Sequence, residues 1–123
     1  MSPWLVVAAV NGLLAVASGA FAAHGLSGRL DAHALGLWET AARYHMYHAL
    51  AIGLAAFAIR DAAAGAATVA SAFFLAGILL FCGSLYLLSV TGAKGFAIVT
   101  PFGGVCFLIG WGALALAATR LKV

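Results

Sequence analysis

The sequence contains very few charged residues. Of its 123 residues, six are Lys or Arg and three are Asp or Glu, whereas 66% are apolar. Ordinary soluble domains are about 25% charged and about 45–50% apolar. Nine charges cannot cover the surface of a soluble domain of this length, and the same composition excludes disordered and fibrous chains. The chain is therefore predicted to be a membrane protein with a single domain, residues 1–123.

Basic residues and cysteines are also too sparse for several familiar kinds of site. The net charge of +3 comes from scattered cations, with no run of Lys or Arg that would bind nucleic acid. Cys82 and Cys106 are too few for a disulfide framework and lack the spacing of metal ligands. Their similar depth in adjacent helices is compatible either with a disulfide or with two buried apolar thiols. We expect neither a cofactor nor a bound metal.

Long stretches without charge divide the chain into membrane spans. Crossing about 30 Å of hydrocarbon takes about 20 apolar residues, and an isolated segment must be helical to pair its backbone groups in lipid. The predicted spans are 3–23, 38–59, 66–90 and 97–118. These four transmembrane helices should form an antiparallel bundle, in which the short loops 60–65 and 92–96 place helices 2–3 and 3–4 side by side. Asp31 is expected to cap a short extra helix, 31–35, in the loop between helices 1 and 2. Pro101 either opens the fourth helix or kinks a helix that began earlier.

Four spans place both termini on the same side of the membrane. Three cations, Arg60, Arg120 and Lys122, lie on the terminal side; Arg29 and Lys94 lie on the other side, with Arg43 at the margin of the second helix there. Since cytoplasmic loops carry an excess of Lys and Arg, this small difference favours cytoplasmic termini.

Histidines are the most unusual polar residues within the spans. Ionisable groups inside a membrane are costly, so each is a candidate for function. His45 and His48 lie about 60° apart on the second helix and are predicted to point into the bundle. They could relay protons, or simply donate to a backbone carbonyl or a neighbouring hydroxyl. His24 lies at a different depth, which argues against a haem pair, and zinc would need three or four convergent ligands.

A second polar pair lies on nearly the opposite face of the same helix. Glu39 and Arg43 are four residues apart and are predicted to form an ion pair. Arg43 is close enough to the predicted boundary for its side chain to reach the headgroups. Alternatively, the pair meets a second subunit, so the sequence is compatible with a homo-oligomer as well as with a monomer.

Four segments in a fixed order resemble a known family. They are Gly19–Leu26 (GAFAAHGL), Tyr44–Leu50 (YHMYHAL), Phe81–Tyr86 (FCGSLY) and Thr100–Gly104 (TPFGG). With this order and spacing, the chain resembles the YgdD-like family of small four-helix membrane proteins, which includes a eukaryotic small transmembrane protein. The resemblance implies a multi-pass protein of the bacterial inner membrane with cytoplasmic termini, and it implies no reaction.

Most polar residues lie in the membrane half nearest loops 24–37 and 92–96, which is the outer half if the termini are cytoplasmic. The candidate polar site comprises His24, Tyr44, His45, His48, Ser84, Tyr86 and Thr100. No nucleophile–base or acid–base pair has a credible geometry, so an enzyme is not expected. The favoured hypothesis is a structural or accessory protein in the lipid bilayer, with no nucleic-acid partner. The alternative is a small-molecule, lipid or proton site lined by His24, His45, His48 and Tyr86.

Overall fold

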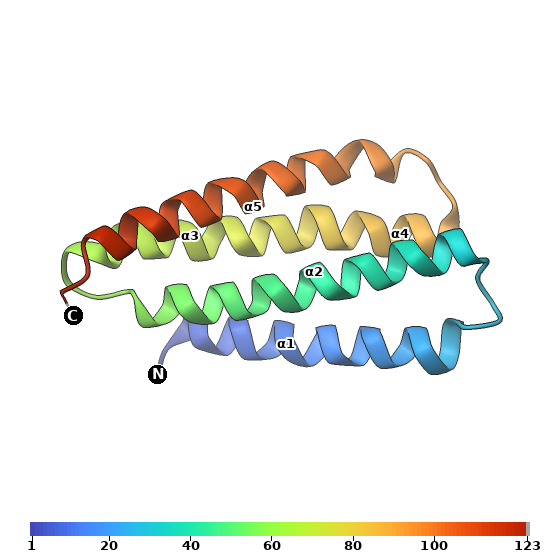
Figure 1. Ribbon diagram of the computed structural model, residues 1–123, viewed down its shortest axis with the longest axis horizontal. Coiled ribbons are helices and arrows are strands. Elements are labelled where there is room, and N and C mark those ends of the chain that lie inside the picture. The colour runs from blue at the N-terminus through green and yellow to red at the C-terminus, as the bar shows by residue number, and fades with distance from the viewer. Residues whose placement is uncertain (123) are drawn as a thin grey trace.

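The computed structural model describes residues 1–122, which form long helices lying along one another (Figure 1). In chain order the elements are α1 (Pro3–Phe21), the π-helical turn η1 (Ala22–Leu26), α2 (Ala32–Phe57), the 3-10 turn η2 (Asp61–Ala63), α3 (Ala64–Gly77), the π-helical turn η3 (Ile78–Cys82), α4 (Gly83–Thr91) and α5 (Phe96–Thr119). α3, η3 and α4 follow one another without a break and form a single long rod (Figure 1).

The helix ends follow local sequence signals, with one departure from the prediction. The Asp31 carboxylate accepts a hydrogen bond from the backbone N–H of Ala34 at 2.8 Å, so it is a helix cap as expected. The separate short helix 31–35 is wrong, however, because these residues are the cap and first turn of α2. Gly36 does not end that turn, since a helical glycine costs only about 1 kcal/mol relative to alanine. Pro101 lies inside α5, which begins at Phe96, so the helix that began earlier is the correct alternative.

The helices are arranged in a row. α1 packs against α2, α2 packs against α3 and α4, and α5 packs against the α3–α4 rod. The predicted adjacency of helices 2–3 and 3–4 is therefore confirmed. Both chain ends lie at one end of the molecule, and the α1–α2 and α4–α5 connections lie at the other, which we call the loop end (Figure 1). α5 lies close to α3 near the termini and diverges from α4 towards the loop end (Figure 1).

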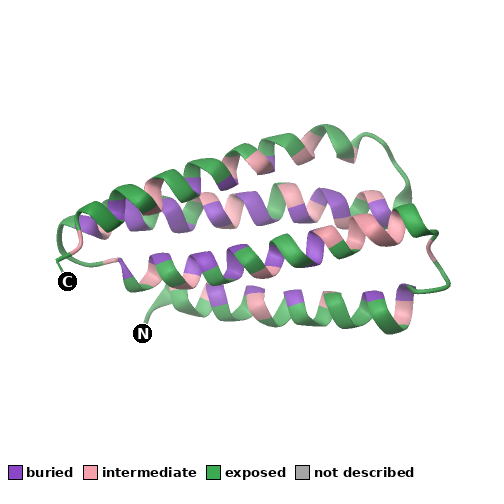
Figure 2. Cartoon of the chain, in the orientation of Figure 1, coloured by how far each residue is buried: buried purple, intermediate pink, exposed green. Residues whose placement is uncertain are grey.

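The outer surface is apolar, as a lipid-facing surface should be. Three helical segments, Pro3–Leu26, Asp61–Thr91 and Phe96–Thr119, are long and apolar enough to cross a membrane. Large side chains project outward from them; Leu13, for example, is 67% exposed. Figure 2 shows exposed residues along α1 and α5 and buried residues concentrated on α2 and α3. Exposing so large an apolar surface to water would be unfavourable, whereas the hydrocarbon core of a membrane accommodates it.

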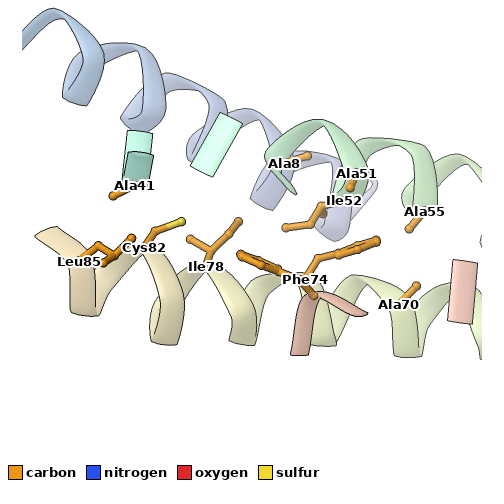
Figure 3. Packing of buried hydrophobic residues seen from close by; sticks show 11 residues of the cluster. Ala8, Ala41, Ala51, Ile52, Ala55, Ala70, Phe74, Ile78, Cys82 and Leu85 are labelled. Carbon is orange, nitrogen blue, oxygen red and sulfur yellow. The ribbon is translucent and has the colours of Figure 1, made fainter. Parts of the chain in front are cut away.

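Small residues allow the helices to approach closely. In the core, Ala51, Ile52 and Ala55 of α2 face Phe74 of the α3–α4 rod (Figure 3). A side chain at Gly110 would place its Cβ 2.6 Å from Cδ1 of Phe74, which is inside van der Waals contact. Because lipid supplies no hydrophobic driving force between helices, such close packing and interhelical hydrogen bonds must hold them together.

Candidate functional site

His45 connects three helices through both of its ring nitrogens. Its Nε2 lies 2.9 Å from Oδ1 of Asn11 on α1, and its Nδ1 lies 3.1 Å from the hydroxyl of Tyr86 on α4. The Asn11 amide nitrogen donates to the Val7 carbonyl at 2.9 Å, so its oxygen is the acceptor that faces the histidine. His45 Nε2–H therefore donates to Oδ1 of Asn11. In the neutral ring, Nδ1 then accepts a hydrogen bond from the Tyr86 hydroxyl.

His48 connects α2 to α5 with the opposite arrangement of protons. Its Nδ1 lies 2.8 Å from the Tyr44 carbonyl, and its Nε2 accepts the indole N–H of Trp111 at 3.2 Å. A carbonyl only accepts and an indole N–H only donates, so His48 must be neutral with its proton on Nδ1. The ring also stacks on Phe107, with centroids 3.5 Å apart and an interplanar angle of 8°.

Both imidazoles are buried, and each ring nitrogen forms a hydrogen bond within the protein. His45 is 6% exposed and His48 is 5% exposed. Within residues 1–122, every buried side-chain nitrogen or oxygen has a hydrogen-bond partner. Neither histidine has a nitrogen free for a ligand or metal unless one of these hydrogen bonds is broken. The prediction that the histidine face of this helix points inward is confirmed.

Two further hydrogen bonds join helices near the loop end. The indole N–H of Trp38 on α2 donates to the Ser18 carbonyl on α1 at 2.8 Å. The hydroxyls of Ser84 on α4 and Thr100 on α5 lie 2.6 Å apart. Together with the two histidines, these contacts link α1 to α2, α2 to the α3–α4 rod, the rod to α5, and α2 to α5. We call the side chains of Asn11, Trp38, His45, His48, Ser84, Tyr86, Thr100 and Trp111 the polar network.

The structure brings together some of the predicted site residues and leaves others apart. His45 and Tyr86 are bonded to each other, whereas Ser84 and Thr100 form a separate pair. His24 is exposed in η1 and takes no part in the polar network. Tyr44 contributes its backbone carbonyl to His48 and stacks beside it, with ring centroids 6.0 Å apart. The predicted residues other than His24 are thus distributed among three hydrogen-bonded groups rather than around one cavity.

Three members of the polar network, Asn11, Trp38 and Trp111, are missing from the predicted site. Asn11 is buried opposite His45, and Trp111 reaches His48 from the terminal half of α5. A signal for each was present in the sequence. Asn11 is a side-chain amide within an apolar span, and an indole N–H inside a membrane must find an acceptor.

Glu39 and Arg43 lie on the outside of the molecule. Both are exposed and line an open groove between α1 and α2. The Arg43 guanidinium donates to the Thr40 hydroxyl at 3.3 Å. At about 1.5 Å per residue, Glu39 and Arg43 lie roughly 11 and 17 Å along α2 from its first residue. Their predicted mutual pairing stays a prediction.

The thiols and acidic residues do not form a metal centre. Within residues 1–122, no three His, Cys, Asp or Glu side chains come together in a way that could hold a metal ion. Cys82 is buried, Cys106 is half-buried, and both are free thiols.

The chain is similar to proteins that are described as membrane proteins. The profile of the family described as "Protein of unknown function (DUF423)" matches residues 18–104. The chain is 45% identical to the UPF0382 membrane protein YwdK of Bacillus subtilis over 121 residues, which cover 98% of both chains. It is 41% identical to the UPF0382 inner membrane protein YgdD of Escherichia coli over 118 residues, covering 96% of this chain and 90% of the relative. No solved structure matches the chain.

Proposed function

The chain belongs to the DUF423 family of membrane proteins, for which no activity is assigned, and on that premise we propose that it is a structural or accessory protein. The observation that carries the proposal is the saturation of the polar network. In a ligand or proton site, we would expect at least one group to be held ready for an incoming partner. Here both nitrogens of His45 and Nε2 of His48 are already bonded to neighbouring helices, and Nδ1 of His48 is bonded to the Tyr44 carbonyl within α2. These side chains can therefore set the register of the helices.

We place four spans across the bacterial inner membrane: the three apolar helical segments described above and, in addition, α2. α2 has 26 residues, so it is about 39 Å long and can cross the hydrocarbon despite its two charges. It lies between α1 and the α3–α4 rod, both of which are apolar enough to span. Because α2 lies alongside these two spanning rods, it must lie at the same depth in the membrane. The antiparallel order then puts both termini on one face, which we assign to the cytoplasm from the excess of Arg and Lys at that end.

A homo-oligomer formed through the α1–α2 face is the second part of this proposal. The groove there holds Glu39 and Arg43 among small residues such as Ala15 and Gly19. A carboxylate and a guanidinium one turn apart are self-complementary across a two-fold axis, so Glu39 of each copy would meet Arg43 of the other. Such pairing would remove two charges from contact with lipid, where they are costly.

Substitution of the His45 cluster tests the structural role. Asn11→Leu should destabilise the protein, because it leaves Nε2–H of a buried His45 without an acceptor. Replacing the whole cluster by apolar side chains, as in Asn11→Leu/His45→Leu/Tyr86→Phe, should restore part of the lost stability. The free energy of unfolding in mixed micelles measures both effects. An Asn11→Leu variant as stable as the original protein would contradict the proposal.

The alternative of a small-molecule, lipid or proton site at His24, His45, His48 and Tyr86 has a different signature. Residues of a binding site are often destabilising in the absence of their ligand, so apolar replacements there would raise stability. Native mass spectrometry from mild detergent would then also detect a small molecule that is lost with the His45 or His48 substitutions. The exposed position of His24, away from the other three residues, does not favour this alternative.

A further inference from the structure

A polar pocket opens at the loop end of the molecule. Its volume is about 500 Å³, and it lies where the start of α2 meets the end of α4 and the connection to α5. Three basic side chains, Arg29, His33 and Lys94, line it together with one acid, Asp31. The Asp31 carboxylate already caps α2 by accepting from Ala34 N–H. The pocket therefore has two permanent cations, and its single acid is engaged by the backbone.

An apolar groove continues from this pocket towards the middle of the membrane. It has a volume of about 530 Å³ and shares His33, Leu37, Leu88 and Ala97 with the polar pocket. α2 and α5 both pack on α4, and residues of all three helices line the groove. Its deepest lining residues are Phe81 on the rod and Gly104 on α5. From Leu88 to Phe81 the groove runs seven residues, about 10 Å along the helix.

The divergence of α5 from α4 explains why the groove is open. At the deep end of the groove, Gly103 lies so close to Phe81 that an added Cβ would overlap the Phe81 backbone. Nothing lies within 4 Å of the position that a Cβ would take at Gly104. The close packing of Gly103 on Phe81 thus closes the space between α5 and the rod at the depth of the deepest lining residues, and the α4–α5 connection forms the mouth of the groove.

We propose that the pocket and groove together bind one anionic phospholipid, with the phosphate between Arg29 and Lys94 and part of an acyl chain against Leu85 and Gly104. The charge of the mouth selects an anion, since cations near a membrane surface attract anionic headgroups. The apolar groove begins at the same mouth and lies at acyl-chain depth. A free phosphate would use only the upper part, and a protein helix would leave the two cations unmatched. The combined shape and charge therefore favour a lipid.

Native mass spectrometry of the protein in mild detergent tests this site. The probes are phosphatidylglycerol and phosphatidylcholine with identical acyl chains, so that only headgroup charge differs. We expect phosphatidylglycerol to bind more tightly, by roughly fivefold for each cation that contacts the phosphate. Arg29→Gln/Lys94→Gln should abolish that preference. Arg60→Gln/Arg120→Gln, which removes two exposed cations from the opposite end, is the matched control and should retain it.

A second pair of variants tests the acyl groove. Gly104→Phe fills the groove and should weaken binding of both lipids, whereas Gly112→Phe, at another open position on α5, should leave it unchanged. Soluble glycerol phosphate, which has the headgroup chemistry without chains, should not compete. The proposal is overturned if the two lipids bind equally, if both cation pairs matter equally, if Gly104→Phe has no effect, or if glycerol phosphate competes. The arginine and lysine variants change exposed loop residues, so they remain informative even if Gly104→Phe fails to fold.

Discussion

The hydrogen bond between Trp111 and His48 allows a quantitative test of the polar network. Trp111→Phe removes the indole N–H that donates to His48 Nε2 at 3.2 Å and leaves an unpaired acceptor on a side chain that is 5% exposed. Interhelical hydrogen bonds in membranes contribute about 0.6 kcal/mol on average and at most about 1.7 kcal/mol, and an orphaned buried acceptor adds to the loss. Because Trp111 is itself 43% exposed, little packing is lost with it. We expect Trp111→Phe to lower the free energy of unfolding by about 1–2 kcal/mol.

Substitution of the other partner, His48, should lower the free energy of unfolding by less. His48→Phe keeps an aromatic ring that can stack on Phe107, and the indole N–H that it releases belongs to a partly exposed residue. In the double variant His48→Phe/Trp111→Phe neither polar partner remains. It should therefore be no less stable than Trp111→Phe alone, which gives a coupling energy of about 0.6–1.7 kcal/mol in the double-mutant cycle.

Reversible unfolding in mixed micelles of mild detergent and sodium dodecyl sulfate, followed by circular dichroism, measures all four proteins. Trp4→Phe provides a control for the loss of an indole at a site far from His48. Strictly additive single effects would refute the reasoning, because they would mean that the two side chains do not interact.

Three further sets of substitutions test packing, association and topology. Gly103→Ala should destabilise the protein by about 1–3 kcal/mol, since its Cβ would overlap the Phe81 backbone, whereas Gly104→Ala next to it should be nearly neutral; thermal unfolding compares the two. Arg43→Leu should dissociate a dimer if Arg43 meets Glu39 of a second subunit, as measured by native mass spectrometry; an unchanged subunit number with unchanged stability would instead show that Arg43 only reaches the headgroups. In a background in which Cys82 and Cys106 are replaced by alanine, Lys94→Cys should react with an impermeant thiol reagent added to intact cells, and Lys122→Cys should not. The opposite pattern would reverse the assigned orientation.

The helical architecture was largely predictable because it depends on composition. Charge-free stretches located three of the predicted helices closely; the predicted 97–118, for example, is α5, Phe96–Thr119. The helix predicted over 38–59 begins six residues earlier, at Ala32. Short loops similarly determined which helices are neighbours. The extra helix 31–35 was mispredicted because a cap and a nearby glycine also occur at the start of one continuous helix. Tertiary contacts, rather than local propensity, decide between these outcomes.

The polar contacts were harder to predict because they depend on which faces of different helices meet. The periodicity of α2 placed His45 and His48 on a common inward face, and the structure agrees. It could not show that the helices form a row in which α2 has neighbours on both sides. Within that row His45 reaches both Asn11 and Tyr86, and His48 reaches across to Trp111. Partner identity therefore had to come from the three-dimensional arrangement.

The protonation of the two histidines tests the central claim most directly. Nitrogen NMR of the protein labelled with 15N-histidine, in lipid bilayers at neutral pH, distinguishes the two neutral tautomers from each other and from the imidazolium cation. The saturated polar network predicts one neutral ring with its proton on Nε2, His45, and one with its proton on Nδ1, His48. His45→Phe and His48→Phe assign the signals. An imidazolium cation at His45 or His48, or the same neutral tautomer at both of these positions, would contradict the account.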